Sequence, residues 1–313
     1  MSLPVSILVL VLAIAALAFA SHFFVANAII FAERTGHSKI FTGVVVIGFG
    51  TALPELATAV FASVAHHPSV GVASSLGATV INLTVVAGIT AVTAMPAISS
   101  RTLKNEGLVS VFGAVLFAAG FVVVHLSYLF SLVPLGVFVV STFMIIRNSG
   151  VDTGYESEVP EELSSKSLLV VGTLCLGGLA GTLLAAQVFL DAALNIADLA
   201  GMSKVMAGAI IVSFGTSLPE IASSVQAAIK KAPDLAIGNA LGSSFFNSLV
   251  AAPAAVLFDP SGKIGGVAFT SFFAMACSIV FYFMMWSGRR LSRSEGAVLL
   301  MLYGAFLGYY FLG

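Results

Sequence analysis

Ten long apolar runs restrict the fold of this chain more strongly than any other feature of its sequence. A transmembrane helix needs about 20 predominantly apolar residues. Runs of about this length lie between breaks made by charged residues, glycine, proline or serine. They occupy residues 3–32, 40–65, 69–95, 107–125, 128–146, 168–195, 204–229, 234–257, 265–286 and 294–312. The sequence therefore predicts an all-α integral membrane protein with ten transmembrane helices.

The composition makes lipid the expected solvent of these helices. Hydrophobic residues make up 59% of the 313 residues and charged residues only 9%, whereas an ordinary soluble domain has about 25% charged residues. The formal net charge of −1 excludes the clustered basic surface that nucleic-acid binding requires. Cys175 and Cys277 lie in apolar runs without a neighbour at metal-binding spacing, so we expect them to pack as small apolar residues.

The first twenty residues have one feature of a secretory signal. Ala18-Phe19-Ala20 matches the small residues of a cleavage site, but the basic segment that precedes the apolar core of a signal peptide is missing. The second half of the chain also contains a counterpart of this segment. We therefore expect residues 3–32 to be retained as the first span.

The distribution of lysine and arginine predicts the orientation, because cytoplasmic loops carry an excess of both residues. With the N-terminus outside, Lys204 and Lys263 fall outside and the other eleven basic residues fall on the cytoplasmic side. Those eleven are Arg34, Lys39, Arg101, Lys104, Arg147, Lys166, Lys230, Lys231, Arg289, Arg290 and Arg293. The sequence predicts a multi-pass protein of the plasma membrane with its N-terminus outside.

The two halves of the chain are copies of one another. Phe-Gly-Thr-Ala-Leu-Pro-Glu at 49–55 recurs as Phe-Gly-Thr-Ser-Leu-Pro-Glu at 214–220, an offset of 165 residues. The same offset relates Asn82 to Asn247 and Leu-Gly at 76–77 to Leu-Gly at 241–242. Similarity without a gap over roughly sixty residues indicates an internal repeat and not chance.

Five spans in each copy require the second copy to be inverted in the membrane. The second span ends at His66 and His67 on the outside, whereas its counterpart ends at Lys230 and Lys231 on the inside. Inverted repeats that enclose a site at their interface are a recurrent architecture of secondary transporters. We expect two five-helix repeats, residues 1–146 and 168–313, joined by a cytoplasmic linker, residues 147–167.

Glu55 and Glu220 indicate a function most directly. Each lies within an apolar span, where an ionisable side chain costs about 3 kcal/mol on insertion scales. Pro54 and Pro219 precede them and remove backbone donors. We therefore expect free carbonyls near residues 48–51 and 213–216, which a cation can use. The symmetry of the two acids favours an ion site over a protonated glutamate that only joins two helices.

A second motif in each half adds further oxygen ligands. Small residues dominate 73–82 and 238–247 and allow close helix packing, and both segments end in an asparagine, Asn82 or Asn247. We expect these two amides to join the two carboxylates in a cage of oxygen atoms. Hard cations such as Ca²⁺ bind six to eight such ligands. The hydroxyl groups expected nearby are those of Thr51, Thr216, Ser217 and Ser243.

These motifs resemble a known signature. Gly-Thr-Ser-Leu-Pro-Glu at 215–220 and Gly-Asn-Ala-Leu-Gly-Ser-Ser at 238–244 are similar to the alpha-repeats of the cation/Ca²⁺ antiporter superfamily, in particular its prokaryotic Na⁺/Ca²⁺ exchangers. The resemblance covers nearly the whole chain. It implies an antiporter without a cofactor that exchanges Ca²⁺ for Na⁺ as the first and sixth helices slide. It assigns ligands to Glu55, Glu220, Thr51, Thr216, Ser243 and Asn82, and backbone carbonyl ligands to Gly48 and Ser213.

Four positions depart from the pattern of that superfamily. Ala52 and Ala78 stand where serines are usual, Ser74 where asparagine is usual, and Asn247 where aspartate is common. The missing hydroxyls weaken one peripheral Na⁺ position. Without the aspartate, two negative charges remain, and one Ca²⁺, two Na⁺ or two H⁺ neutralise them equally well. Na⁺ and H⁺ therefore both stay open as the coupling ion.

Two alternative functions use the same residues. A proton-coupled antiporter is one, because two carboxylates in a small desolvated site favour binding of a proton by one of them. Proton-coupled relatives usually carry Gly-Asn-Ala-x-Glu, whereas both halves here carry Gly-Thr-x-Leu-Pro-Glu. A cation channel with Glu55 and Glu220 as its selectivity ring is the other, and inverted repeats around one central site argue against it.

No enzymatic function is expected. Serine, histidine and cysteine form no nucleophile or metal constellation at membrane depth. The expected partners are the transported ions and the lipid bilayer, with no obligate protein partner.

Overall fold

The computed structural model describes residues 2–35, 39–123, 128–148, 167–199, 201, 206–259 and 266–312. These residues are almost entirely helical, and within them the only extended pairing is the isolated bridge between Ala97 and Arg290. Lys204, Lys263 and most of the predicted linker lie outside the described residues.

The helices of the first half follow the predicted apolar runs. The second, third and fourth spans each contain a wide π-helical turn, labelled η. The spans are α1 (Leu3–Thr35); α2 (Lys39–Thr42), η1 (Gly43–Gly48), α3 (Phe49–Thr51) and α4 (Leu53–Val64); α5 (Pro68–Ile81), η2 (Asn82–Val86) and α6 (Ala87–Ala94); α7 (Ser100–Thr102), η3 (Leu103–Gly107) and α8 (Leu108–Val123); and α9 (Tyr128–Asn148).

The second half repeats this order, except that its fourth span is one uninterrupted helix. Its spans are α11 (Leu168–Leu199); η4 (Ala207–Val212), α13 (Ser213–Thr216) and α14 (Leu218–Ile229); α15 (Pro233–Phe246), η5 (Asn247–Ala251) and α16 (Ala252–Leu257); α17 (Ala268–Gly288); and α18 (Arg293–Leu312). The chain thus has the predicted all-α fold, with ten transmembrane helices in two inverted five-helix repeats. Among the described residues, seven helices are long and apolar enough to cross a membrane, and 108–120 and 131–147 are shorter apolar helices.

The repeat is visible in the helix boundaries themselves. α4 and α14, α5 and α15, and η2 and η5 begin and end at positions that differ by 165 residues. The turn before each small-residue helix is also duplicated. His66 and Lys231 occupy the same place in the two copies and have φ angles of 60° and 55°, and Pro68 and Pro233 then start α5 and α15. A proline is well tolerated in the first turn of a helix, where its missing N–H is not needed.

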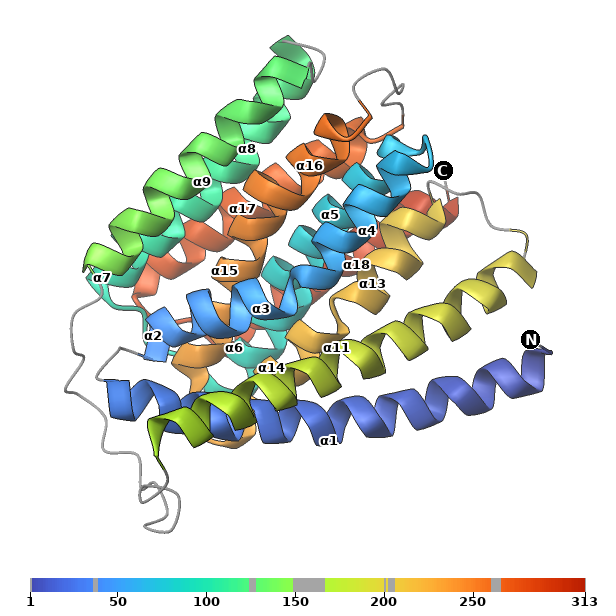
Figure 1. Cartoon of the computed structure of the whole chain (residues 1–313). Coiled ribbons are helices and arrows are strands. Elements are labelled where there is room, and N and C mark those ends of the chain that lie inside the picture. The colour runs from blue at the N-terminus through green and yellow to red at the C-terminus, as the bar shows by residue number, and fades with distance from the viewer. Residues whose placement is uncertain are drawn as a thin grey trace.

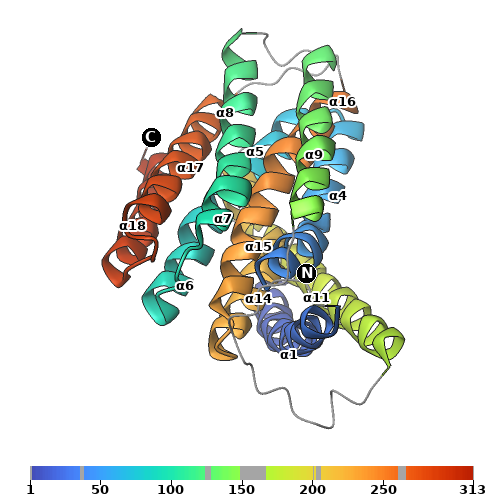
Figure 2. The ribbon, with the colours of Figure 1, turned by 90° about the vertical axis from the view of Figure 1, so that its left-hand side faces the viewer.

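α1 and α11 pack along each other, and this pair crosses the remaining helices on one side of the bundle (Figure 1, Figure 2). The two helices approach closely, since a Cβ atom on Gly178 of α11 would lie 2.7 Å from Cα of Phe24 in α1. Asn195 Nδ2 of α11 also donates to Ser6 Oγ of α1 at 2.8 Å. On the bundle side, His22 Nδ1 of α1 lies 3.1 Å from Gln226 Oε1 of α14.

The small-residue helices α5 and α15 form the buried centre of the bundle. Each packs on the motif-bearing span of the opposite half. A Cβ atom on Gly242 of α15 would lie 2.5 Å from the carbonyl oxygen of Val44 in η1. Likewise, a Cβ atom on Gly77 of α5 would lie 2.7 Å from the carbonyl oxygen of Ala209 in η4. Glycine at these positions is what allows the backbones of the two repeats to meet.

Candidate functional site

The two motif glutamates lie where a span is broken and restarted. α3 ends at Thr51 and α4 begins at Leu53, so Glu55 is in the first turn of α4. α13 ends at Thr216 and Glu220 is likewise in the first turn of α14. The first turn of a helix carries a partial positive charge. The breaks therefore place each carboxylate where a negative charge is best tolerated inside an apolar span.

All ten predicted site residues are buried. Neither Glu55 nor Glu220 has any exposed surface. The other eight predicted residues are buried as well, and they are Gly48, Thr51, Asn82, Ser213, Thr216, Ser217, Ser243 and Asn247. A set of this polarity is unusual in the interior of a membrane protein, where polar groups mark ion or substrate pathways.

The side chains of the two halves interleave around the glutamates. Ser217 Oγ donates to Glu55 Oε1 at 3.3 Å, and the Thr216 hydroxyl also lies beside the Glu55 carboxylate. Thr51 and Ser243 lie beside the Glu220 carboxylate, which is close enough to Glu55 for the two to interact electrostatically. The motifs of both repeats therefore meet in one place.

Several polar atoms of this set have no hydrogen-bond partner among the described residues. A buried polar atom without a partner costs free energy, and in native structures it calls for an explanation such as a bound ion. Three of the four carboxylate oxygens belong to this group, and so do both side-chain amides. The atoms are Glu55 Oε2, Glu220 Oε1 and Oε2, and Oδ1 and Nδ2 of both Asn82 and Asn247.

Asn82 and Asn247 start equivalent π-helical turns. η2 packs against α14, and η5 packs against α4. Each asparagine therefore lies on a segment that contacts the glutamate-bearing helix of the opposite half. π-helical turns inside α-helices often mark functional sites, because the extra residue changes which side chains point toward a neighbour.

The expectation of free carbonyls is wrong at Gly48 and Ser213. The N–H of Ala52 donates to the Gly48 carbonyl at 3.2 Å, and the N–H of Ser217 donates to the Ser213 carbonyl at 3.0 Å. The physical reason is spacing. A proline withholds its N–H from the carbonyl four residues earlier, and for Pro54 this carbonyl belongs to residue 50, not residue 48.

Asn239 of α15 is a site residue to which the sequence analysis assigned no role. Its Oδ1 accepts from Thr51 Oγ1 at 3.3 Å and from Ser243 Oγ at 3.2 Å. Its Nδ2 donates to the carbonyl oxygen of Glu220 at 3.0 Å and to Ser224 Oγ at 2.8 Å. The signal in the sequence was an amide in the middle of a helix of small and apolar residues.

The polar support of the site comes mainly from the second half. Ser243 Oγ reaches across to the Gly48 carbonyl at 3.0 Å, as Ser217 reaches Glu55. The repeat-related residues in the first half, Ala78 and Ala52, have no hydroxyl to return these bonds. Ser74, which corresponds to Asn239, is buried, and its hydroxyl has no partner among the described residues.

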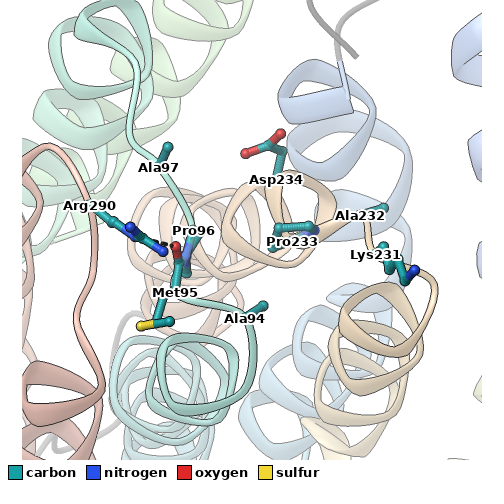
Figure 3. A pocket seen from close by; sticks show the side chains of 9 residues that line it. All are labelled: Ala94, Met95, Pro96, Ala97, Lys231, Ala232, Pro233, Asp234 and Arg290. Atoms are coloured by element: carbon teal, nitrogen blue, oxygen red, sulfur yellow. Dashed lines mark hydrogen bonds between the residues drawn. The ribbon is translucent and has the colours of Figure 1, made fainter. Parts of the chain in front are cut away.

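A pocket of about 380 Å³ opens away from these residues, between the end of α6, the start of α15 and the turn before α18 (Figure 3). Lys231, Asp234 and Arg290 are its charged lining residues. Arg290 Nε donates to the carbonyl oxygen of Met95 at 3.1 Å across it. The pocket contains none of the predicted ligands, and Lys231 and Arg290, both predicted to be cytoplasmic, lie at the same end of the bundle.

The types of side chain in the site limit the ions that it can hold. Among the described residues, no three His, Cys, Asp or Glu side chains gather as a metal-binding group. The candidate residues instead offer carboxylate, amide and hydroxyl oxygens. Such ligands suit hard cations, Ca²⁺ and Na⁺ among them, rather than the soft or imidazole-binding transition metals.

Comparisons with known proteins all indicate the same family. The sequence model of the sodium/calcium exchanger protein family matches residues 5–147 and 170–312, once in each half. CaxA of Alkalimonas amylolytica, described as an antiporter, is 30% identical over 92% of this chain and 92% of its own length. The sodium/calcium exchanger MaX1 of Methanosarcina acetivorans is 27% identical, with 97% of this chain and 98% of MaX1 covered.

The fold also matches solved structures. A structure of the sodium-calcium exchanger NCX_Mj, soaked with 2.5 mM Na⁺ and 10 mM Sr²⁺, superimposes with a TM-score of 0.81 at 25% identity. The match covers 98% of this chain and 99% of that one. The chain therefore belongs to the sodium/calcium exchanger protein family, and it is a polytopic membrane antiporter, not an enzyme.

Proposed function

We propose that this chain exchanges Ca²⁺ for Na⁺ by alternating access, with the ion held between Glu55 and Glu220 near the middle of the membrane. One observation carries the proposal. Three of the four oxygens of these buried carboxylates lack a hydrogen-bond partner among the described residues. An acid without a partner is not expected to persist at membrane depth unless an ion or a proton neutralises it.

The charges of the proposed site suit exchange. The two carboxylates carry the negative charge that balances either one Ca²⁺ or two Na⁺. A third Na⁺ would leave a net positive charge in a region of low dielectric constant, where uncompensated charge is costly. Ca²⁺ and Na⁺ therefore compete for one set of ligands, which is the requirement for coupled exchange through a single site.

Na⁺ is proposed as the coupling ion because of the relatives. MaX1 and NCX_Mj are both named as sodium/calcium exchangers. Coupling to H⁺ is the alternative, since the same two carboxylates can bind protons. The peripheral pair α1 and α11 is the proposed moving unit, because it crosses the bundle on one side and the glutamate-bearing helices α4 and α14 lie within the bundle.

The decisive experiment measures uptake of radioactive Ca²⁺ into proteoliposomes under an outward Na⁺ gradient and, separately, under a pH gradient. We expect uptake with the Na⁺ gradient alone. Uptake driven only by the pH gradient would replace Na⁺ with H⁺ as the coupling ion. Single-channel currents in a planar bilayer would instead favour a channel.

The site assignment is tested in the same vesicles with Glu55→Gln and Glu220→Gln. Each variant removes one of the two charges that would neutralise the buried Ca²⁺, so we expect Ca²⁺ uptake to fall by at least about a hundredfold. Ser278→Ala is the matched control, because Ser278 is buried in α17 and its hydroxyl bonds only within its own helix, to the carbonyl of Ala274. Normal uptake by both glutamine variants would refute the paired-glutamate site.

We also propose that the chain resides in the plasma membrane with its N-terminus outside, from the distribution of lysine and arginine. Ten spans then return the C-terminus to the outside. A C-terminal alkaline phosphatase fusion is expected to be active and a green fluorescent protein fusion dark in a bacterial host. The reverse result would invert the orientation.

A further inference from the structure

Asn239 is fully buried and uses every hydrogen-bonding atom of its amide. It joins α15 to the end of α3 in the first repeat and to α14 in its own repeat. Of its four hydrogen bonds, the one with Thr51 crosses the boundary between the repeats and the other three lie within the second repeat. Its contacts are to Thr51, Ser243, Ser224 and the backbone of Glu220.

The contacts determine how the amide is oriented. The carbonyl oxygen of Glu220 can only accept a hydrogen bond, so the atom of Asn239 that faces it must be the donor Nδ2. Oδ1 must then face the Thr51 and Ser243 hydroxyls, and it can only accept from them. The orientation of the amide is therefore fixed by the chemistry of one neighbour.

This orientation gives two hydroxyl protons a second acceptor. The proton of Thr51 has two acceptors, the Ile47 carbonyl and Asn239 Oδ1. The proton of Ser243 also has two, the Gly48 carbonyl and Asn239 Oδ1. A hydroxyl that donates to the protein keeps its lone pairs for another ligand. Both hydroxyls lie beside Glu220, so their oxygens are available to a cation there.

We propose that Asn239 is a positioning residue that turns the Thr51 and Ser243 hydroxyls into cation ligands and holds the backbone of Glu220. The inference rests on the proposed cation site and assigns no direct contact between Asn239 and the ion. It also accounts for the one-sided arrangement of the site. Ser74 is the repeat-related residue, and its short side chain makes none of these bonds among the described residues.

The test compares the Michaelis constant for Ca²⁺ and the maximal rate of uptake in proteoliposomes. Asn239→Ser introduces the residue found at position 74. We expect it to raise the Michaelis constant for Ca²⁺ about tenfold or more, since two ligand hydroxyls lose their common acceptor, and to change the maximal rate by less than about threefold. Ser75→Ala is the control, because its buried hydroxyl bonds within its own helix to the Gly71 carbonyl, and both constants should stay unchanged.

A double-mutant cycle separates positioning from general loosening of the fold. Thr51→Val alone should raise the Michaelis constant about tenfold. In the double variant Asn239→Ser/Thr51→Val, the Michaelis constant should exceed that of the more impaired single variant by no more than about threefold. Independent effects would multiply to about a hundredfold and would overturn the proposal. A Michaelis constant within threefold of wild type in Asn239→Ser would also overturn it.

Asn239→Asp covers the case in which Asn239→Ser does not fold. It retains an oxygen that accepts from Thr51 and Ser243 but loses the Nδ2 donor to the Glu220 carbonyl, so its Michaelis constant for Ca²⁺ should rise by less than the roughly tenfold expected for Thr51→Val. A rise of about tenfold or more would contradict the acceptor role of Asn239. If the proposed function is wrong, the wild type itself will not take up Ca²⁺, which distinguishes that outcome from failure of the Asn239 proposal. In that case, uptake of Na⁺ by the same variants, with the same expected ratios between their Michaelis constants, tests the role of Asn239.

Discussion

The Ser217 hydroxyl of the second repeat donates a hydrogen bond of 3.3 Å to the Glu55 carboxylate of the first repeat. Because the repeat-related residue is Ala52, Glu220 receives no equivalent bond. The two acids are therefore related by sequence and by fold, but they differ in their surroundings.

Removal of the Ser217 hydroxyl should weaken binding at the Glu55 side. A hydrogen bond to a charged group contributes about 1.5–3 kcal/mol, and a bond of 3.3 Å belongs at the weak end of this range. Ser217→Ala should raise the Michaelis constant for Ca²⁺ about tenfold with a normal maximal rate. Ser271→Ala in α17, a buried serine bonded to the Val267 carbonyl, should have no effect. An unchanged constant in Ser217→Ala would show that this hydroxyl does not support the site.

The charge of the site predicts electroneutral exchange. With two carboxylates, one Ca²⁺ and two Na⁺ balance the site equally, so clamping the membrane potential with K⁺ and valinomycin should not change the rate of Na⁺-driven Ca²⁺ uptake. Asn247→Asp places a third carboxylate in the same buried set. The variant should bind an additional monovalent ion, and its exchange rate should then depend on the potential. A potential-dependent wild type would contradict the two-charge account.

Close packing of α15 on η1 makes Gly242 intolerant of a side chain. A Cβ atom there would lie 2.5 Å from the Val44 carbonyl oxygen and 2.7 Å from its Cα atom, so backbone has to move. Overpacking of this kind costs about 1–3 kcal/mol, and Gly242→Ala should lower the melting temperature in detergent by several degrees. Gly304→Ala in α18 is the control, because no atom lies within 4 Å of its added Cβ. Equal melting temperatures for the two variants would contradict this packing.

Movement of α1 and α11 against the bundle is testable by cross-linking. His22 of α1 lies 3.1 Å from Gln226 of α14, which joins the peripheral pair to the bundle, whereas Ser6 and Asn195 join α1 to α11 within the pair. In a background without native cysteines, a short thiol cross-linker between positions 22 and 226 should stop Ca²⁺ uptake. The same reagent between positions 6 and 195 should leave it intact. Full activity of the first cross-linked protein would exclude sliding of this pair as the transport step.

The spans and the duplication were predictable from the sequence because lipid imposes simple rules. A helix must be long and apolar to cross the bilayer, and the offset of 165 residues reappears in the boundaries of α4 and α14. Local details were less predictable. The π-helical turns at Asn82 and Asn247 have no compositional signature. Whether the Gly48 carbonyl is free depends on whether the residue four positions later has an N–H to donate.

The contacts of Asn239 also could not be predicted from the sequence. Its role depends on α15 of one repeat packing on η1 and α3 of the other, which is a tertiary relationship. Asn239 stood within a recognisable motif, but the motif does not say that its amide points to Thr51 rather than to an ion. Symmetry favoured Asn82 and Asn247 as candidates because both halves carry them, and it concealed Asn239 because the first half has Ser74.

The π-helical turn η1 ends at Gly48, upstream of Glu55, and η4 ends at Val212, upstream of Glu220 and one residue short of the repeat-related position. A π-helical turn contains one residue more than the α-helical turn that it replaces. Deleting a single residue from η1 would therefore restore an ordinary α-helical turn and leave the side chains after it facing the same way. The same deletion in a regular α-helical stretch would rotate those side chains by about 100° about the helix axis and turn Thr51 away from Asn239. A one-residue gap in an alignment of such chains therefore belongs within these wide turns, where it keeps the candidate ligands paired.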